Sequence, residues 1–166
     1  MKNLMKPLYN IVAMALLLTA GACNSSNHAA ATASSVAIAR AIDSSNWKFI
    51  ATEVMPQYGT ARHADFNYDV KFTNDKLVVY LPYFGKADAG ANVFSDRGPL
   101  DFTSAKFTID KQQGKKGQWL VTLVPKDYRE VQSMNFTFYP GGNANLSITM
   151  TNRTPISFGG NVEPVK

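Results

Sequence analysis

After Ser45 the chain alternates polar and apolar residues with a period of two, a pattern that predicts β-strands with one solvated and one buried face. Residues 65–73 alternate without a break. Asn74 and Asp75 then predict a turn and residues 76–83 a second strand, so we expect a β-hairpin here. Six more strands are predicted, at residues 47–54, 105–111, 118–124, 134–139, 145–151 and 155–158.

Glycine and proline residues separate these strands, and the gaps are too short for the helical crossovers that parallel strands need. The predicted fold class is therefore all-β, a single antiparallel β-sandwich or partly open β-barrel of about seven to nine strands. One short N-terminal helix is expected before the first strand, capped by Ser34 or Ser35 and continuing through Ile42. Residues 36–166 then form a single β-rich domain.

One face of the predicted sheet is rich in aromatic residues, which admits two interpretations. Such a face can line a ligand cavity, or it can be the core of a β-domain, where aromatic residues are favoured in any case. The core is the favoured interpretation. The residues concerned are Phe66, Tyr68, Phe72, Tyr80, Phe107, Trp119, Phe136 and Phe138.

The first 22 residues are organised like an export signal. Lys2 and Lys6 give a positive start, and residues 8–19 are largely apolar, yet this run is shorter than the about 20 residues of a membrane-spanning helix. The sequence Leu-Thr-Ala-Gly-Ala-Cys at residues 18–23 resembles a bacterial lipobox, which implies removal of residues 1–22 as a lipoprotein signal peptide and acylation of Cys23. The alternative is an ordinary cleaved signal peptide followed by an incidental cysteine.

Residues 23–35 are expected to be a lipidated flexible tether. After Cys23 they are Asn, Ser, Ala and Thr apart from His28, and a coil of this length reaches roughly 20 Å. Two or more acyl chains anchor stably, because each buried methylene contributes about 0.8 kcal/mol. Asn24 is not the aspartate that retains some lipoproteins at the inner membrane, and no acidic run follows. By resemblance to these sorting signals, we expect an outer-membrane lipoprotein that faces the periplasm.

Charge does not favour nucleic acid as a partner. The formal net charge of +5 falls to +3 without Lys2 and Lys6, because 15 Lys and Arg then stand against 12 Asp and Glu. The excess is dispersed, and its densest stretch, residues 111–116, surrounds a turn predicted at Gly114.

The sequence contains no recognisable catalytic or metal-binding pattern. Cys23 is the single cysteine, so a cysteine zinc cage is excluded, and the two histidines are His28 and His63. Neither a calcium-loop spacing nor a nucleophile elbow occurs. We therefore predict no cofactor, no metal and no enzymatic activity. A hydrolase that uses carboxylates near Tyr83 is the least favoured alternative.

Two segments supply weak candidates for ligand or partner binding. In Leu-Pro-Tyr-Phe-Gly, residues 81–85, Pro82 must lie at an edge or a strand end because it cannot donate to a ladder. Tyr83 and Phe84 then either close the core or form a contact patch, and closure is favoured. In residues 152–160, Arg153 either binds a carboxylate or phosphate or pairs with an internal Asp at a strand entry, and the pair is favoured.

These two motifs, together with Trp-Lys-Phe at residues 47–49, resemble the domain of unknown function 4251 family, found in exported proteins and lipoprotein precursors of Bacteroides-like bacteria. The resemblance runs from about Ala37 to Val162. Lys86 stands where arginine is more common, and Phe158 where tyrosine is. The family carries no established activity, cofactor or catalytic residues, and the resemblance implies a β-rich single domain in the cell envelope.

Anchor and domain together predict a non-enzymatic, lipid-anchored binding or interaction module of the cell envelope. Its expected partners are the membrane, through acyl chains on Cys23, and another envelope protein. The alternative function is a small-ligand or lipid-binding β-barrel, in which an aromatic-lined cavity holds a small apolar ligand.

Overall fold

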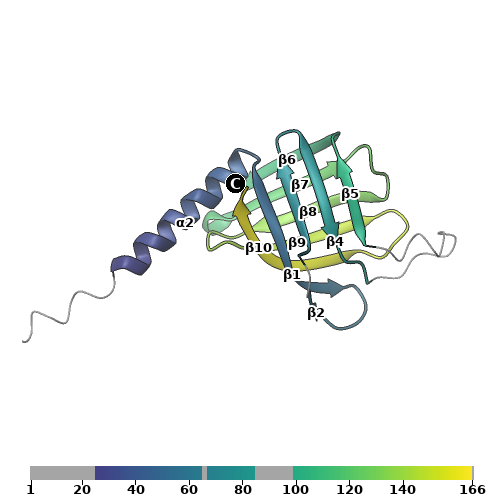
Figure 1. Ribbon diagram of the computed structural model, residues 1–166, viewed down its shortest axis with the longest axis horizontal. Helices are drawn as coiled ribbons and strands as arrows, with labels where there is room; N and C mark the ends of the chain where they lie inside the picture. Colours follow the sequence, from purple (N-terminus) through teal and green to yellow (C-terminus); the bar gives the residue numbers. More distant parts are fainter. Residues whose placement is uncertain (1–24, 65–66, 85–98, 166) are drawn as a thin grey trace, which may run out of the picture. The chain divides into compact units, whose positions relative to one another are not determined.

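The structure, a computed structural model, describes residues 25–64, 67–84 and 99–165 (Figure 1). The predicted signal peptide, Cys23 and Phe66 lie outside the described residues. One helix precedes the sheet, and the compact folded unit begins within that helix, at Ser34.

The strands form one antiparallel sheet of ten strands that curls into a nearly closed barrel (Figure 1). The strand order is β5-β4-β3-β1-β10-β9-β8-β7-β6, and the short β2 pairs with β1 off this path. The elements are α2 (Ser25–Asp43), β1 (Trp47–Pro56), β2 (Arg62–His63), β3 (Asp69–Thr73), β4 (Lys76–Leu81), β5 (Leu100–Ser104), β6 (Phe107–Gln113), the 3₁₀ turn η1 (Lys115–Gly117), β7 (Trp119–Pro125), β8 (Val131–Phe138), β9 (Asn143–Met150) and β10 (Ile156–Pro164).

The predicted all-β antiparallel fold is confirmed, and each of the eight predicted strands corresponds to an observed one. The sequence pattern missed β2 and β5, so the structure has ten strands where about seven to nine were expected. It also ended the last strand at residue 158, because Gly159 and Gly160 look like a turn in the sequence, whereas β10 continues to Pro164.

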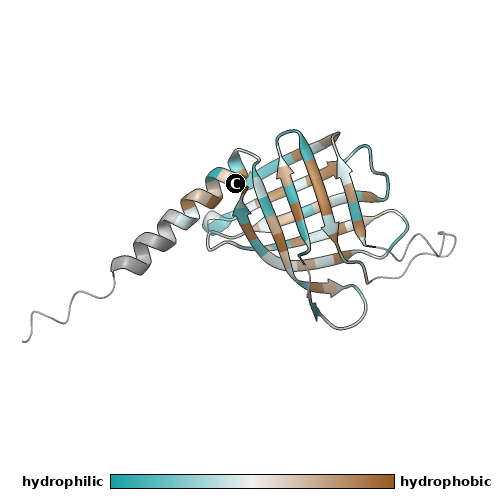
Figure 2. Ribbon diagram, viewed as in Figure 1, coloured by the Kyte–Doolittle hydropathy of each residue, from teal (hydrophilic) through white to brown (hydrophobic). Residues whose placement is uncertain are grey.

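Hydrophobic and hydrophilic residues alternate along the strands (Figure 2). This alternation buries every second side chain over much of the sheet. In β4, Leu77, Val79 and Leu81 are buried while Lys76 and Tyr80 are exposed. The prediction that Tyr80 shares the buried aromatic face is therefore wrong, because its position in the register turns it outward, where its ring meets that of Tyr68 at 5.3 Å.

The centre of the barrel is a cluster of packed aromatic rings. The fully buried Trp47 indole lies 4.9 Å from the rings of both Phe136 and Phe138 in edge-on contacts, and 5.3 Å from Phe72. Phe107 extends the cluster through Phe72. Burying each ring contributes roughly 1.5–3 kcal/mol. Of the predicted aromatic face, Phe72, Phe107, Phe136 and Phe138 therefore belong to the core, together with Trp47.

A β-bulge in β1 lies opposite the two glycines of β10. Ala51 pairs with Gly160 and Glu53 with Gly159, so Thr52 is the extra residue. The backbone of β1 passes so near Gly160 that a Cβ there would lie 2.0 Å from the carbonyl oxygen of Ile50. Glycine is therefore required at this close approach of two strands.

Helix α2 is longer than the sequence pattern indicated. It begins at Ser25, so residues 25–35 are helical, and the expectation of a coil there is wrong. Alanine-rich composition favours a helix over these residues. From Ser34 onward the helix docks on the barrel through Ile38, Ala41 and Ile42, which are buried. Among the described residues, no helix combines the length and apolarity that a membrane span requires.

Lys111 of β6 fixes the carboxyl end of α2. Its ammonium group donates to the carbonyl oxygens of Ile42 and Asp43 and to the Ser45 hydroxyl. The last carbonyls of a helix have no partner within the helix, and the helix dipole favours a cation there. Lys111 therefore joins α2 to an edge strand of the sheet.

The two edge strands, β5 and β6, follow each other in the chain and are joined by Ala105 and Lys106. The Asp127 carboxylate accepts the Ser104 hydroxyl and the amides of Ala105 (2.9 Å) and Lys106 (3.1 Å). The Ser104 hydrogen bond and these amides lower the pKa of Asp127. One carboxylate thus ties the β5–β6 connection to the β7–β8 turn.

Candidate functional site

Tyr83, one of the predicted binding residues, is buried at the end of the barrel where β4 finishes. Its side chain is 7% exposed, and its hydroxyl donates to the Thr154 carbonyl at 3.1 Å and lies 3.2 Å from the Thr154 hydroxyl. The guanidinium of Arg153 lies over the Tyr83 ring, 4.9 Å from its centroid. The two predicted residues Tyr83 and Arg153 are therefore in direct contact.

Arg153 is also buried, and a glutamate is one of its partners. Its Nη2 lies 3.7 Å from Oε2 of Glu130, with side chains that are 7% and 51% exposed. This glutamate comes from the turn between β7 and β8, whose position depends on the strand order, and a pair of Arg153 with an internal Asp stays a prediction. A buried guanidinium needs such partners because its charge is costly to desolvate.

The same glutamate extends the cluster to a second aromatic pair. Glu130 accepts the Tyr128 hydroxyl at 3.1 Å, and the Tyr128 ring stacks on Phe102 with centroids 4.0 Å apart. Burial of the phenol and the nearby Glu130 charge raise the pKa of Tyr128 to about 12. We call Tyr83, Tyr128, Glu130, Arg153 and Thr154 the end cluster.

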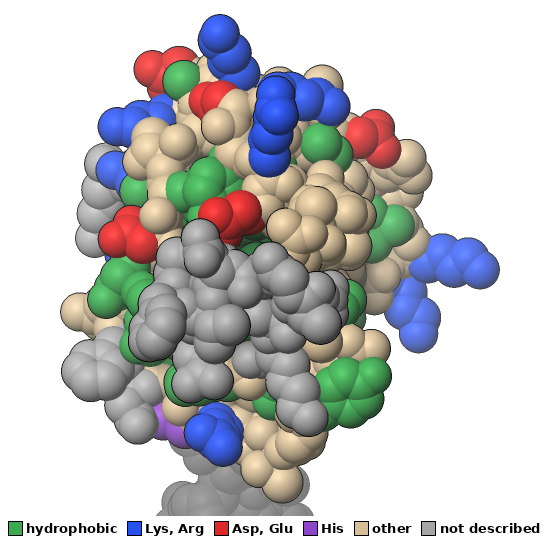
Figure 3. Space-filling view, turned by 90° about the vertical axis from the view of Figure 1, so that its right-hand side faces the viewer, with side chains coloured by type: hydrophobic (Ala, Val, Ile, Leu, Met, Phe, Trp, Pro, Cys, Tyr) green, Lys and Arg blue, Asp and Glu red, His purple; other side chains and the backbone are tan. Residues whose placement is uncertain are grey.

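Phe84, the third predicted residue, faces outward. It is 47% exposed, and the Arg62 guanidinium lies 5.4 Å from its ring centroid. Tyr58 is also exposed, at 66%. Seen from this side of the molecule, apolar, basic and acidic side chains are interspersed (Figure 3).

The residues of the end cluster contact one another. Among the described residues, Tyr83 and Arg153 contact each other, Thr154 and Glu130. No group of three or more His, Cys, Asp and Glu side chains suited to a metal ion occurs in the part of the chain that the structure describes. Phe84 remains as the predicted residue on the outer surface.

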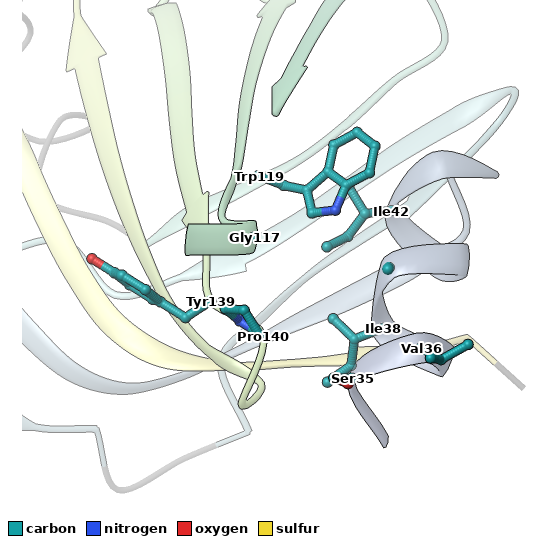
Figure 4. A pocket seen from close by; sticks show the side chains of 9 residues that line it. Ser35, Val36, Ile38, Ile42, Gly117, Trp119, Tyr139 and Pro140 are labelled. Atoms are coloured by element: carbon teal, nitrogen blue, oxygen red, sulfur yellow. The ribbon is translucent and has the colours of Figure 1, made fainter. Parts of the chain in front are cut away.

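An apolar groove lies at the other end of the strands, beside α2 (Figure 4). The Trp119 indole lies beside Ile42, and Pro140 of the β8–β9 turn lies across from Ile38. The groove has a volume of ≈ 240 Å³. We call it the α2 groove; its lining residues are Ser35, Val36, Ile38, Ala39, Ile42, Gly117, Trp119, Tyr139 and Pro140.

A second hollow continues past Trp119 and Val36 along the helix. It has a volume of ≈ 340 Å³ and adds Arg40, Asp43 and Gln113 to the lining. Sequence reasoning missed both hollows because they depend on where the helix docks. The signal present in the sequence was the spacing of Val36, Ala39 and Arg40 on one helix face.

Comparison with known proteins settles the family. The family model described as Domain of unknown function (DUF4251) matches residues 29–162. The chain belongs to this family. A crystal structure of a DUF4251 family protein from Bacteroides eggerthii DSM 20697 has a similar fold, with a TM-score of 0.59 at 18% sequence identity. The similarity covers 82% of this chain and 91% of that one, and no curated protein matches the chain.

The two motifs on which the resemblance to DUF4251 rested meet in space. Residues 81–85 supply Tyr83, residues 152–160 supply Arg153 and Thr154, and these side chains contact one another at the end of the barrel. About 70 residues separate them in the chain, so their contact is a tertiary one. In this DUF4251 protein the two motifs therefore lie together at one end of the barrel.

Proposed function

We propose that this DUF4251 protein is a lipid-anchored, non-enzymatic binding module of the cell envelope. The observation that supports this proposal is the lipobox-like sequence at residues 18–23, which precedes a folded unit that begins at Ser34. Acyl chains on Cys23 hold the amino end in a membrane, which we place at the outer membrane, on the periplasmic side. The partners are that membrane and another envelope protein.

The described side chains support a binding role over a catalytic one. Tyr83 and Arg153 engage each other and their neighbours, and the aromatic rings inside the barrel pack on one another. The surfaces left for contact are the exposed Phe84 with Arg62 and the α2 groove. Both offer apolar area with a nearby cation, which suits a protein or lipid partner.

Replacement of the cysteine tests the anchor. Cys23→Ser removes the thiol to which a diacylglyceryl group attaches, so palmitate labelling should be lost and the precursor should accumulate at its unprocessed mass. Ser26→Ala is the matched control and should be labelled and processed like the wild type. Unchanged processing of the Cys23→Ser chain, with no lipid on the wild-type amino end by mass spectrometry, would overturn the proposal.

A small apolar ligand in the α2 groove is the second candidate function. It is favoured by the lining of Val36, Ile38, Ile42 and Trp119, and its position differs from the central cavity that the sequence suggested. Ala39→Trp should fill the groove and abolish binding of a fatty acid, measured by native mass spectrometry. Ala37→Trp, on an exposed position outside the lining, should leave binding intact.

A further inference from the structure

Apolar and aromatic side chains are exposed around the α2 groove. Val36 is 43% exposed on the helix. Trp119 and Tyr139 are half-buried, with Pro140 exposed next to Tyr139. Tryptophan and tyrosine are the residues that accumulate at membrane–water interfaces, because one part of each ring is apolar and another is polar.

Basic side chains border the same surface. Arg40 lines the second hollow, and Lys115 and Lys116 are exposed in η1, the turn that leads into Trp119. Asp43 is the acidic side chain among the residues that line the two hollows. Aromatic residues flanked by Lys and Arg form a surface that complements an anionic lipid headgroup layer.

The chain length between Cys23 and this surface is short. Cys23 stands 13 residues before Val36, so even a fully extended chain would span at most about 45 Å between them. An anchor at Cys23 would keep the surface near the bilayer at a high effective concentration, so weak contacts suffice to hold it there.

We propose that Val36, Arg40, Lys115, Lys116, Trp119 and Tyr139 form a lipid-contacting surface that rests on anionic headgroups of the anchoring membrane. This rests on the proposed lipid anchor and adds an orientation to it. The end of the barrel that carries α2 faces the bilayer. The end cluster and Phe84, at the other ends of the strands, then face away from it.

Site-specific fluorescence tests the orientation in the full lipidated protein. Lys115→Cys is compared with Lys126→Cys, an exposed lysine at the other end of β7, each labelled with an environment-sensitive dye and reconstituted in phosphatidylcholine vesicles containing phosphatidylglycerol. The emission of the dye at position 115 should shift to shorter wavelength, and a water-soluble quencher should no longer reach it. The dye at position 126 should show neither change. Raising the salt concentration or omitting phosphatidylglycerol should reverse the shift at 115.

Tryptophan quenching provides a second measurement without a label. Trp47 is fully buried and Trp119 is not, so brominated lipids should quench the wild-type protein and leave Trp119→Phe unquenched. A lipidated protein that floats with the vesicles but shows no quenching and no shift at 115 overturns the inference and leaves the anchor standing. An unlipidated wild-type chain overturns the anchor instead. Protection of position 115 by an added envelope protein in place of lipid also overturns the inference.

Discussion

Gly160 occupies a position where a neighbouring strand leaves no room for a side chain. We expect Gly160→Ala to lower the free energy of unfolding by about 3 kcal/mol, at the upper end of overpacking costs, because β1 must move to relieve the clash with the Ile50 carbonyl. Urea unfolding followed by circular dichroism measures this. Gly159→Ala is the control, because its Cβ would meet the flexible Glu53 side chain at 3.4 Å. Equal stability of the two variants would contradict the close approach.

Arg153 and Arg62 each lie over an aromatic ring, but in different surroundings. Arg153 is 7% exposed and Arg62 is exposed, and a cation–π contact gains strength when water is excluded. We expect Arg153→Met to destabilise the fold by about 1–2 kcal/mol, from the lost contact with Tyr83 and the lost ion pair with Glu130. Arg62→Met should lower the free energy of unfolding by less than about 0.5 kcal/mol. Thermal unfolding of the two variants side by side distinguishes them.

The carboxyl end of α2 depends on one side chain of another element. Lys111→Met keeps the aliphatic stem and removes the ammonium group that bonds the Ile42 and Asp43 carbonyls. We expect the free energy of unfolding to fall by about 1 kcal/mol. Amide hydrogen exchange over residues 38–43 should become faster, because the last helical turn frays first. Lys106→Met, at the start of the same edge strand and exposed, should change neither quantity. Unaltered exchange in Lys111→Met would show that the helix end is held by burial alone.

The type of most elements could be predicted from the sequence, and their order in the sheet could not. The alternation in residues 69–73 and 76–81 gave the β3–β4 hairpin. No local pattern indicates that β1 lies between β3 and β10, because that pairing joins strands about 100 residues apart. The strand β5 escaped prediction because its five residues, Leu100–Ser104, offer too short an alternation to stand out.

The candidate residues show the same division between local and long-range information. Tyr83 and Arg153 could be singled out by their motifs, but their contact depends on the strand order that brings the end of β4 to the start of β10. The α2 groove depends on three elements that meet, namely the helix, the η1 turn and the β8–β9 turn. Sequence periodicity gives the apolar face of α2 and not the surface against which it docks.

Asp127 holds the connection between the two edge strands of the barrel, and this makes stability sensitive to acid. The hydrogen bonds from Ser104 and the Ala105 and Lys106 amides lower the pKa of Asp127 below that of an ordinary aspartate. The contribution of Asp127 to stability is therefore present above the ordinary pKa and is lost as the pH falls through the lowered one. Below about pH 4, the urea concentration at the midpoint of unfolding should therefore decrease more steeply for the wild type than for Asp127→Asn. Asp110→Asn, on an exposed strand position, should follow the wild type. Identical acid profiles for all three chains would contradict this role.

The path of the chain from α2 into β1 has a mechanical consequence. Helix α2 ends at Asp43, and the next element, β1, is hydrogen-bonded along its length to β10 and along its first half to β3. A pulling force that enters at the amino end therefore reaches a strand held on both sides, which must shear two ladders at once, rather than an edge strand that can be peeled away bond by bond. A domain with this connection resists mechanical unfolding when it is pulled at its amino end. Its edge strands, β5 and β6, carry little of that force.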